Sequence, residues 1–191
     1  MNYKVNEIFY TVQAEGTFAG KASVFIRLCG CNLQCPWCDT KYHTKGEIYT
    51  KEEIEAKVDY LTHGNKDVNI VFTGGEPTLQ LKEEETLLDG YFRCIETNGT
   101  NEVPSWIDWI TCSPKSDIDF KAIGRKPDEI KVVYEYGRDK YLKDLERYKI
   151  PLFIQPLEQN GKMNIMEVFD FIKQNPTYRL SLQYHKLIGV R

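Results

Sequence analysis

The most informative segment of this chain is Val24-Phe-Ile-Arg-Leu-Cys-Gly-Cys-Asn-Leu-Gln-Cys-Pro-Trp-Cys38. Its first five residues form a short, largely apolar run that is typical of a buried strand. Four of the six cysteines of the chain lie in it, at positions 29, 31, 35 and 38, whereas Cys94 and Cys112 stand alone in apolar runs. We expect those two to be buried, inert thiols. A secreted disulfide scaffold would be shorter and denser in cysteine, so the cluster indicates metal or redox chemistry in a reducing cytosol.

Short apolar runs like residues 24–28 recur along the chain and alternate with helical patterns. A capping box formed by Thr50 and Glu53 begins the first helical pattern, which continues at Ile54, Val58 and Leu61. Apolar strands that alternate with amphipathic helices indicate a parallel α/β sheet. The interval 92–109 is too short for a long crossover helix, so we expect an irregular connection there. The predicted strands are 24–28, 69–73, 92–96, 109–112, 130–134, 152–155 and 180–183. Two later helical patterns follow the same rule, one with Tyr141, Leu145 and Tyr148 and the other with Ile165, Val168, Phe169 and Ile172.

The unusual residues of the sequence follow these strands, each group just beyond the carboxyl end of one strand. In parallel α/β folds and barrels the active site lies at that edge of the sheet. A purely structural role would distribute such residues over both ends of the strands. We therefore expect a single site at the carboxyl edge. The groups are residues 29–38, Thr73-Gly-Gly-Glu-Pro77, Glu96-Thr-Asn-Gly-Thr100, Ser113-Pro-Lys115, Gln155-Pro156 and Gln183-Tyr-His-Lys186.

The length of the chain, 191 residues, limits the architecture. A complete eight-fold β/α barrel takes about 250 residues and at least about 200. We therefore expect an α/β fold with an incomplete, truncated TIM-like barrel of mostly parallel strands, in a single domain over residues 1–191. A sheet that does not close has exposed edges, which proteins usually cover. This favours a homodimer or a covering terminal segment.

Charge and hydropathy exclude several classes of partner. The chain has 25 Lys and Arg against 28 Asp and Glu, a net charge of −3, whereas nucleic-acid-binding domains usually run strongly basic. No window approaches 18 uncharged apolar residues, which argues against a membrane span. The first 16 residues contain Lys4, Glu7 and Glu15 and lack the apolar core of a signal peptide. We expect a cytoplasmic protein that binds neither nucleic acid nor membrane.

The cysteine segment offers more than one set of metal ligands. A structural zinc site usually takes two Cys-x2-Cys pairs far apart in sequence, and this chain has no second pair. Four thiols on one ion would include Cys29, whose side chain points away from Cys31 if the strand extends that far. Three thiolates at the spacing Cys31-x3-Cys35-x2-Cys38 suit a 4Fe-4S cluster with one iron open to a further ligand. The competing interpretation is a non-catalytic metal module, either a zinc-stabilised domain or an electron carrier.

With this spacing, directly after the first barrel-like strand, the chain resembles the radical S-adenosylmethionine (SAM) superfamily. Thr73-Gly-Gly-Glu-Pro77 resembles the glycine-rich motif that binds the methionyl amino group in that superfamily. The resemblance implies a 4Fe-4S cluster on the three cysteines and S-adenosyl-L-methionine as cofactors. An electron passed to the bound sulfonium then cleaves a C–S bond and yields methionine and a 5′-deoxyadenosyl radical. Gly74 and Gly75 permit a close backbone approach because they have no Cβ.

A second set of motifs resembles one family of that superfamily, the 7-carboxy-7-deazaguanine synthases of the 7-deazapurine (queuosine) pathway. The resemblance implies a short homodimeric enzyme that converts 6-carboxy-5,6,7,8-tetrahydropterin into 7-carboxy-7-deazaguanine with loss of ammonia. It also implies a requirement for Mg²⁺ and an external flavodoxin-like or ferredoxin-like reductant. The motifs are Val12-Gln-Ala-Glu-Gly16, Gly20, Arg27, Cys38-Asp-Thr40, Glu96-Thr-Asn-Gly-Thr100, Ser113-Pro-Lys115, Gln155-Pro156 and Leu180-Ser-Leu-Gln-Tyr-His-Lys186.

The same resemblance implies roles for individual residues. Arg27 has a planar fork that suits the carboxylate of the substrate, and Gln13 both donates and accepts hydrogen bonds, as a pterin edge requires. Thr40 is implied for Mg²⁺, which prefers hard oxygen ligands, while Asp39 is the alternative on charge alone. The implied substrate residues are Val12, Gln13, Ala14, Arg27, Thr73 and Arg191. The implied SAM residues are Trp37, Cys38, Asp39, Gly75, Ser113, Pro114, Lys115 and Gln155. Further candidates for the pocket are Glu15, Glu96 and His185.

Two departures and one competing reaction accompany this resemblance. Ala14 stands where the family commonly has Gly, which makes the backbone there less free to approach a substrate. The family tends to close its pocket with the C-terminal carboxylate, and here the last residue is Arg191. The competitor is another small radical SAM enzyme, such as an activase that installs a glycyl radical on a partner protein. Such an enzyme would keep the cysteine motif but would need neither Arg27 nor the motif at 12–16.

Overall fold

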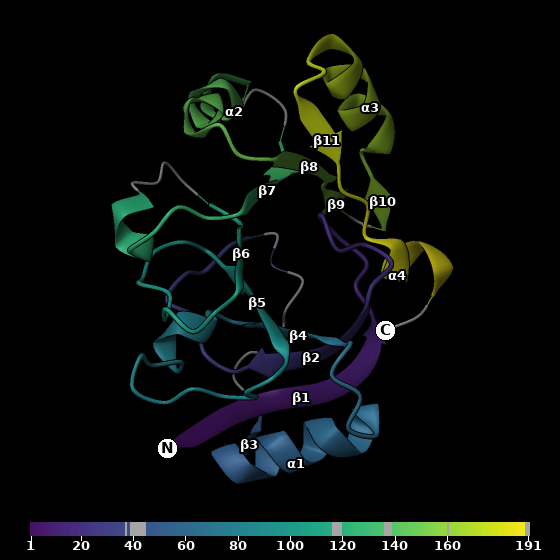
Figure 1. The fold of residues 1–191 in the computed structure, drawn as a ribbon. Coiled ribbons are helices and arrows are strands. Elements are labelled where there is room, and N and C mark those ends of the chain that lie inside the picture. Colours follow the sequence, from purple (N-terminus) through teal and green to yellow (C-terminus); the bar gives the residue numbers. More distant parts are fainter. Residues whose placement is uncertain (37, 39–44, 116–119, 136–138, 160, 190–191) are drawn as a thin grey trace.

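Figure 1 shows the computed structural model of the chain, which describes all residues except 37, 39–44, 116–119, 136–138, 160 and 190–191. Its strands are β1 (Asn2–Val12), β2 (Ala22–Leu28), β3 (Glu47–Thr50), β4 (Asn69–Gly74), β5 (Phe92–Thr97), β6 (Trp109–Cys112), β7 (Glu129–Tyr134), β8 (Leu152–Pro156), β9 (Glu158–Gln159), β10 (Lys162–Met163) and β11 (Tyr178–Leu180). Nine of these described strands form one sheet in the order β11-β8-β7-β6-β5-β4-β2-β1-β3, and β9 pairs with β10 separately.

The sheet is mostly parallel and does not close into a complete barrel. All neighbours from β2 to β11 run parallel, while β1 is antiparallel to both β2 and β3. The sheet curves into an arc, and in the described ladders β11 and β3 are its edge strands, each paired on one side only (Figure 1). The predicted truncated barrel is therefore confirmed.

The seven predicted strands are present, and one of them is displaced. The prediction placed the last strand at 180–183, but β11 covers Tyr178–Leu180 and the chain leaves the sheet after the Ser181 N–H donates to the Ile154 carbonyl at 2.9 Å. The amide of Gln183 instead turns toward Glu15 and donates to its Oε1 at 2.9 Å. The antiparallel strands β1 and β3 were not predicted, although alternate residues Tyr3 and Val5 of β1 are buried. Such alternation is the signal of a half-buried strand.

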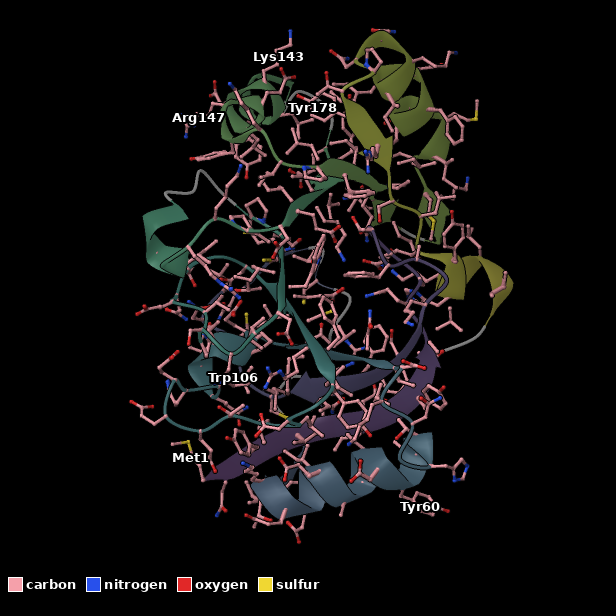
Figure 2. All side chains as sticks on the ribbon, in the orientation of Figure 1. Met1, Tyr60, Trp106, Lys143, Arg147 and Tyr178 are labelled. Atoms are coloured by element: carbon pink, nitrogen blue, oxygen red, sulfur yellow. The ribbon has the colours of Figure 1, made fainter. Side chains whose placement is uncertain are left out.

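Helices α1 (Lys51–Thr62), α2 (Asp139–Leu145) and α3 (Ile165–Gln174) lie on the outer, convex side of the arc (Figure 1). Thr50 and Glu53 form the predicted capping box at the start of α1, and Ile54 and Val58 of that helix are buried. Tyr60, on its opposite face, points away from the sheet (Figure 2). The described residues 98–108 contain no helix, as predicted. The helical elements are α1 (Lys51–Thr62), η1 (Pro77–Leu79), η2 (Phe120–Ile123), α2 (Asp139–Leu145), η3 (Glu146–Tyr148), α3 (Ile165–Gln174) and α4 (Tyr184–Ile188). None of the described helices is long and apolar enough to cross a bilayer.

The prediction for α3 misplaced one buried position. Val168 is buried as expected, but Phe169 is 43% exposed and Phe171 occupies the core instead. The Phe171 ring packs between Tyr134 and Tyr178, with ring centroids 5.1 and 5.2 Å away. Tyr178 lies between α2 and α3 (Figure 2). Two aromatic neighbours therefore fix the rotation of the helix, and periodicity within the helix does not contain that information.

The two faces of the sheet differ in character, and this difference creates a site. Val24, Ile26 and Leu28 of β2 belong to the apolar core beneath the helices. The alternate residues Phe25 and Arg27 face the inside of the arc. The same alternation along the parallel strands places apolar side chains outside and increasingly polar ones inside, toward the carboxyl ends of the strands.

The hairpin loop between β1 and β2 closes the inside of the arc at the amino ends of the parallel strands. Phe18 of this loop packs edge-on against Phe92 and Trp109, with centroids 5.6 and 4.8 Å away. The N–H of Thr17 donates to Glu129 Oε2 at 2.9 Å. The inside of the arc is thus plugged at the amino ends of the strands and open at their carboxyl ends.

Candidate active site

One large cavity lies inside the arc, at the carboxyl ends of the parallel strands. Its volume is about 1430 Å³, enough for a cofactor and a substrate together. The groups that follow the strands in sequence meet in its wall, so the predicted single site at this edge is present in the structure. The residues that line it include Cys31, Cys35, Cys38, Thr73, Gly74, Gly75, Glu96, Asn98, Ser113, Lys115, Gln155, Gln183 and His185.

The cysteine loop forms one part of this wall. Cys31, Cys35 and Cys38 all line the cavity, and the N–H of Cys38 donates to the Cys35 carbonyl at 3.1 Å. Burial raises the pKa of the Cys35 thiol, Lys115 lowers it in part, and Cys38 and Cys31 raise it again. The three thiols therefore interact electrostatically, although no trio of His, Cys, Asp or Glu among the described residues is already gathered as a metal site. A bound cation would supply the positive charge that turns these thiols into thiolate ligands.

Cys29 takes a different direction from its neighbours in the cluster. It is 4% exposed, and its Sγ donates to the Lys45 carbonyl at 3.1 Å. It is not among the residues that line the cavity. The donor set facing the cavity is therefore a three-thiol set, which suits a 4Fe-4S cluster with one open iron.

The loop after β4 packs directly on the cysteine loop. The N–H of Gly75 donates to the Leu28 carbonyl at 2.9 Å, and that of Glu76 to the Gly30 carbonyl at 2.7 Å. A Cβ on Gly75 would collide with the Gly30 carbonyl oxygen, and Gly74 adopts φ 115, which favours glycine. These two positions thus require glycine for a structural reason, and they leave the backbone bare where it lines the cavity.

Glu76 of the same loop has a structural role that sequence reasoning did not separate from the ligand motif. It is fully buried, and its carboxylate accepts from Thr78 N and Oγ1, at 3.2 and 2.6 Å. It also accepts from Thr97 Oγ1 at 2.8 Å and from Asn98 N at 2.7 Å. Its carboxylate therefore ties the end of β4 to the end of β5 and does not line the cavity.

Asparagines at the end of β5 extend this connection to the cysteine loop. Asn98 Nδ2 donates to Asn32 Oδ1 at 2.9 Å, and Asn32 Nδ2 donates to Thr100 Oγ1 at 2.7 Å. Thr100 in turn donates through its N–H and hydroxyl to Asn98 Oδ1. The segment Glu96-Thr-Asn-Gly-Thr100 therefore positions the cysteine loop, and this gives a physical reason for its polar composition.

The opposite wall carries groups that can bind a polar ligand. Lys115 Nζ donates to Ser113 Oγ at 2.8 Å, and the Ser113 N–H is held by the Thr97 carbonyl at 2.7 Å. Gln155 is 6% exposed and lines the cavity, and its Oε1 is a buried acceptor without a hydrogen-bond partner among the described residues. Pro114 is buried but does not line the cavity. An unpartnered buried oxygen of this kind calls for a donor on a ligand.

The floor of the cavity is a network of charged side chains on the inner face of the sheet. Lys131 of β7 forms ion pairs with Glu15 of the hairpin loop and, at 3.3 Å, with Glu96 of β5. Thr73 Oγ1 of β4 donates to the other oxygen of Glu96 at 2.9 Å. Gln183 from the segment after β11 donates to Glu15. Side chains from four strands or loops thus meet around one buried ammonium.

Charge pairing dominates the electrostatics of this floor. Burial alone would lower the pKa of Lys131, but Glu15 and Glu96 outweigh it and raise that pKa above its usual range. Burial alone would raise the pKa of Glu96, but Lys131 and the Thr73 hydroxyl outweigh it and lower that pKa. Lysine and carboxylate are therefore charged at neutral pH despite their burial.

Arg27 lies at the edge of this network. Its Nε forms an ion pair with Glu7 Oε1 at 2.9 Å, and its guanidinium carbon lies 5.9 Å from the centre of the Phe9 ring. Both charged side chains are about a quarter exposed, and Arg27 also lines the cavity. Because the ion pair uses Nε, the Nη groups of the fork are the part that suits a carboxylate in the cavity.

The remaining predicted positions divide into three groups. Val12, Gln13 and Ala14 line the cavity, and Gln13 Oε1 accepts from the N–H groups of Ala14 and Glu15, at 2.8 and 3.1 Å. Cys94 and Cys112 are buried in strands, and burial raises their pKa, for Cys112 to about 12, as expected of inert thiols. Trp37, Asp39, Thr40 and Arg191 lie outside the described residues.

Sequence reasoning missed Lys131, the central cation of the floor. It lies within a predicted buried strand, where lysine is rare unless it is paired. Glu129, Lys131 and Val133 alternate with Ile130, Val132 and Tyr134, and only the second group belongs to the apolar core. A lysine within an otherwise apolar predicted strand is therefore the feature of the sequence from which this site residue could have been found.

Comparisons with known proteins agree with this arrangement. The family model of the Radical SAM superfamily matches residues 25–149, which include the cysteine loop and the strands around it. The 7-carboxy-7-deazaguanine synthase of Bacteroides thetaiotaomicron is 43% identical over an alignment of 199 residues that covers 100% of both chains. That of Haemophilus influenzae is 37% identical, with 99% of this chain and 94% of the relative covered. The crystal structure of QueE from Escherichia coli superimposes with a TM-score of 0.74 and 29% identity, over 96% of this chain and 94% of that one.

Proposed function

The chain belongs to the radical SAM superfamily and, within it, to the 7-carboxy-7-deazaguanine synthases, and from this premise we propose how its residues carry the reaction. The enzyme converts 6-carboxy-5,6,7,8-tetrahydropterin into 7-carboxy-7-deazaguanine with loss of ammonia. Relatives with this name, between 34% and 43% identical over the whole chain, decide against the glycyl-radical activase and the non-catalytic metal module. The residue roles below are our assignment.

The cluster loop supplies the ligands for the iron–sulfur cofactor. Cys31, Cys35 and Cys38 hold the 4Fe-4S cluster, and the chemistry that the cluster and SAM supply is reductive cleavage of the sulfonium to a 5′-deoxyadenosyl radical. The protein positions the reacting groups and excludes water. We place the whole machinery in one domain over residues 1–191.

Residues on both walls hold SAM between the cluster and the substrate. The backbone at Gly75, which lines the cavity, receives the methionyl end. The unpartnered Oε1 of Gln155 accepts a hydrogen bond from the cofactor. Ser113 and Lys115 offer a hydroxyl and a cation from the same wall. Trp37, Cys38, Asp39 and Pro114 complete the assigned SAM residues.

The substrate takes the part of the cavity that lies over the charged floor. The fork of Arg27 binds its carboxylate, and Thr73 and the backbone of Val12 and Ala14 line its ring. Gln13 contributes its Nε2 donor, since its Oε1 already accepts two backbone N–H groups. We also assign Arg191 to the substrate pocket.

Magnesium and the reductant complete the proposed reaction. We assign Mg²⁺ to the Thr40 hydroxyl together with substrate oxygens, because magnesium uses few protein ligands and hard oxygen donors. The electron comes from an external flavodoxin-like or ferredoxin-like protein. We place the enzyme in the cytoplasm, with a small-molecule substrate and without nucleic-acid or membrane partners.

The homodimer has a candidate surface beside the open edge of the arc. Val12, Leu187 and Ile188 are half exposed or more. They lie near a hollow of about 320 Å³ whose lining includes Val12, Tyr184 and Ile188. A second copy that covers this apolar surface would remove it from water. Sedimentation that shows a monomer at micromolar concentration would contradict the dimer.

One observation carries the proposed function: the three thiols, the bare glycine loop and Arg27 share one cavity of about 1430 Å³. The test is binding of carboxytetrahydropterin to anaerobically reconstituted protein, which should hold about four irons per chain. Arg27→Ala should weaken binding by about tenfold to a hundredfold, because a charged bidentate contact is lost. Arg147→Ala, on the outer surface (Figure 2), should leave it unchanged. Unaltered binding in Arg27→Ala would overturn the assignment of the substrate carboxylate.

A further inference from the structure

Lys131 is the most deeply buried charge in the cavity floor. Its side chain is 8% exposed, against 12% for Glu15 and 22% for Glu96. An ammonium in this position needs an opposite charge, and here it has two. Within these ion pairs one cation faces two carboxylates, which leaves an excess of one negative charge. Glu129, which also acts on Lys131, and Arg27, which also acts on Glu96, add one charge of each sign and leave that excess unchanged.

The hydrogen bonds show which carboxylate carries that excess. Glu15 is held on both oxygens, by Lys131 and by Gln183 Nε2 at 2.9 Å. Glu96 is likewise held on both oxygens, by Lys131 at 3.3 Å and by Thr73 Oγ1 at 2.9 Å, but it lies farther from the ammonium and is the more exposed of the two. Glu129, on the same strand as Lys131, has its own donors in Thr111 Oγ1 and Thr17 N. Glu96 is therefore the more accessible of the two carboxylates that pair with Lys131 and line the cavity.

We propose that Lys131 is a positioning residue for substrate binding: it neutralises Glu15 and holds Glu96 ionised toward the donor edge of the bound pterin. This inference rests on the proposed function, because the amino-pyrimidinone edge of a pterin presents adjacent N–H donors. A carboxylate accepts two such donors side by side, in the same way as it accepts the fork of an arginine. Lys131 itself does not touch the reacting atoms.

The charge arithmetic gives a test that does not depend on one variant. Glu15→Gln leaves one cation facing one carboxylate and removes the excess charge, so the KM for the carboxypterin should rise by about tenfold. Adding Lys131→Met to Glu15→Gln restores a single negative charge on Glu96. The double variant should return to within about threefold of the wild-type KM. A role in packing alone predicts the reverse order, with the double variant worse than the single one.

The single variant Lys131→Met adds a pH readout. Two carboxylates that share a site without a cation resist joint ionisation, so the pKa of one of them rises. KM should then climb as the pH falls from about 8 to about 6, whereas the wild-type KM should stay flat. Among the described residues, the titratable and charged groups that face Lys131 or line the surrounding cavity are Glu15, Glu96, Glu129, Arg27, Lys115, Glu158, His185, Lys186 and the thiols of Cys31, Cys35 and Cys38.

Control measurements separate this inference from folding and from the proposed function. Lys173→Met, which removes a lysine from an exposed ion pair on α3, should change neither KM nor its pH dependence. Thermal unfolding and pterin-independent cleavage of SAM should show that each variant is folded and loaded. Failure of the wild type to convert the carboxypterin would overturn the proposed function. Conversion by the wild type, with no recovery in the double variant, would overturn the role of Lys131 alone.

Discussion

Replacement of Glu76 by alanine should unfold the connection between β4 and β5 at a cost that can be worked out from its contacts. The carboxylate accepts two backbone N–H groups, from Thr78 and Asn98, and two hydroxyls, from Thr78 and Thr97. All of these donors are buried. The hydroxyls have alternative arrangements because each can rotate, but the two N–H groups are fixed by the backbone.

The expected loss of stability follows from those two fixed donors. A buried donor left without an acceptor costs about 1–3 kcal/mol, so the two fixed donors alone give about 2–6 kcal/mol. This is a large part of the roughly 5–15 kcal/mol that stabilises a typical domain. Glu76→Gln keeps one oxygen but turns an NH₂ group toward either Asn98 or the donors of Thr78 and Thr97, so we expect an intermediate loss of about 2 kcal/mol.

Urea denaturation of the reduced apoprotein under anaerobic conditions measures this difference through the midpoint and the slope. The matched control is Glu83→Ala, which removes a carboxylate that accepts from the N–H and hydroxyl of Ser105 at an exposed position. Water replaces those bonds, so the control should shift the midpoint far less than Glu76→Ala. A Glu76→Ala protein within about 1 kcal/mol of wild type, with an unchanged slope, would refute the reasoning.

Three further outcomes are expected. Gly75→Ala should retain iron but lose 5′-deoxyadenosine formation after reduction, because the new methyl group displaces the loop from the Gly30 carbonyl; a wild-type yield of 5′-deoxyadenosine would contradict this. Gln155→Leu should weaken SAM binding by about tenfold without loss of stability, since Oε1 has no described protein partner to lose; calorimetric titration with SAM checks it, and undiminished affinity would remove Gln155 from the site. In the apoprotein at about pH 8.5, burial raises the pKa of Cys94 and of Cys112 and keeps both thiols protonated, so iodoacetamide should spare both. Mass spectrometry that finds either of them alkylated as fast as the cluster thiols would contradict their burial.

The sequence was sufficient to predict the parallel core and the edge at which the site lies. The runs at 24–28, 69–73 and 109–112 are largely apolar because most of their residues are buried. The cysteine loop and the glycine loop follow two of these strands, so the parallel topology alone brings them together. Length then predicted an open arc, because the chain is too short to close it.

The charged floor could not be predicted in the same way. Glu15, Glu96 and Lys131 are separated by up to 116 residues, and only the curvature of the sheet and the inward fold of the hairpin loop bring them together. The structural role of Glu76 was not predicted for a related reason, since it stands inside a ligand motif yet bonds to residues at the end of the next strand. The rotation of α3 likewise depends on the ring of Tyr134, which is distant in sequence from Phe171, and on that of Tyr178 in the following strand.

The most direct test of the account is anaerobic turnover of 6-carboxy-5,6,7,8-tetrahydropterin by the reconstituted enzyme with SAM, a chemical reductant and Mg²⁺. The account predicts 7-carboxy-7-deazaguanine and ammonia in equal amounts, with slower product formation when Mg²⁺ is removed. Reductive cleavage of SAM by the loaded protein without any deazaguanine product would contradict it.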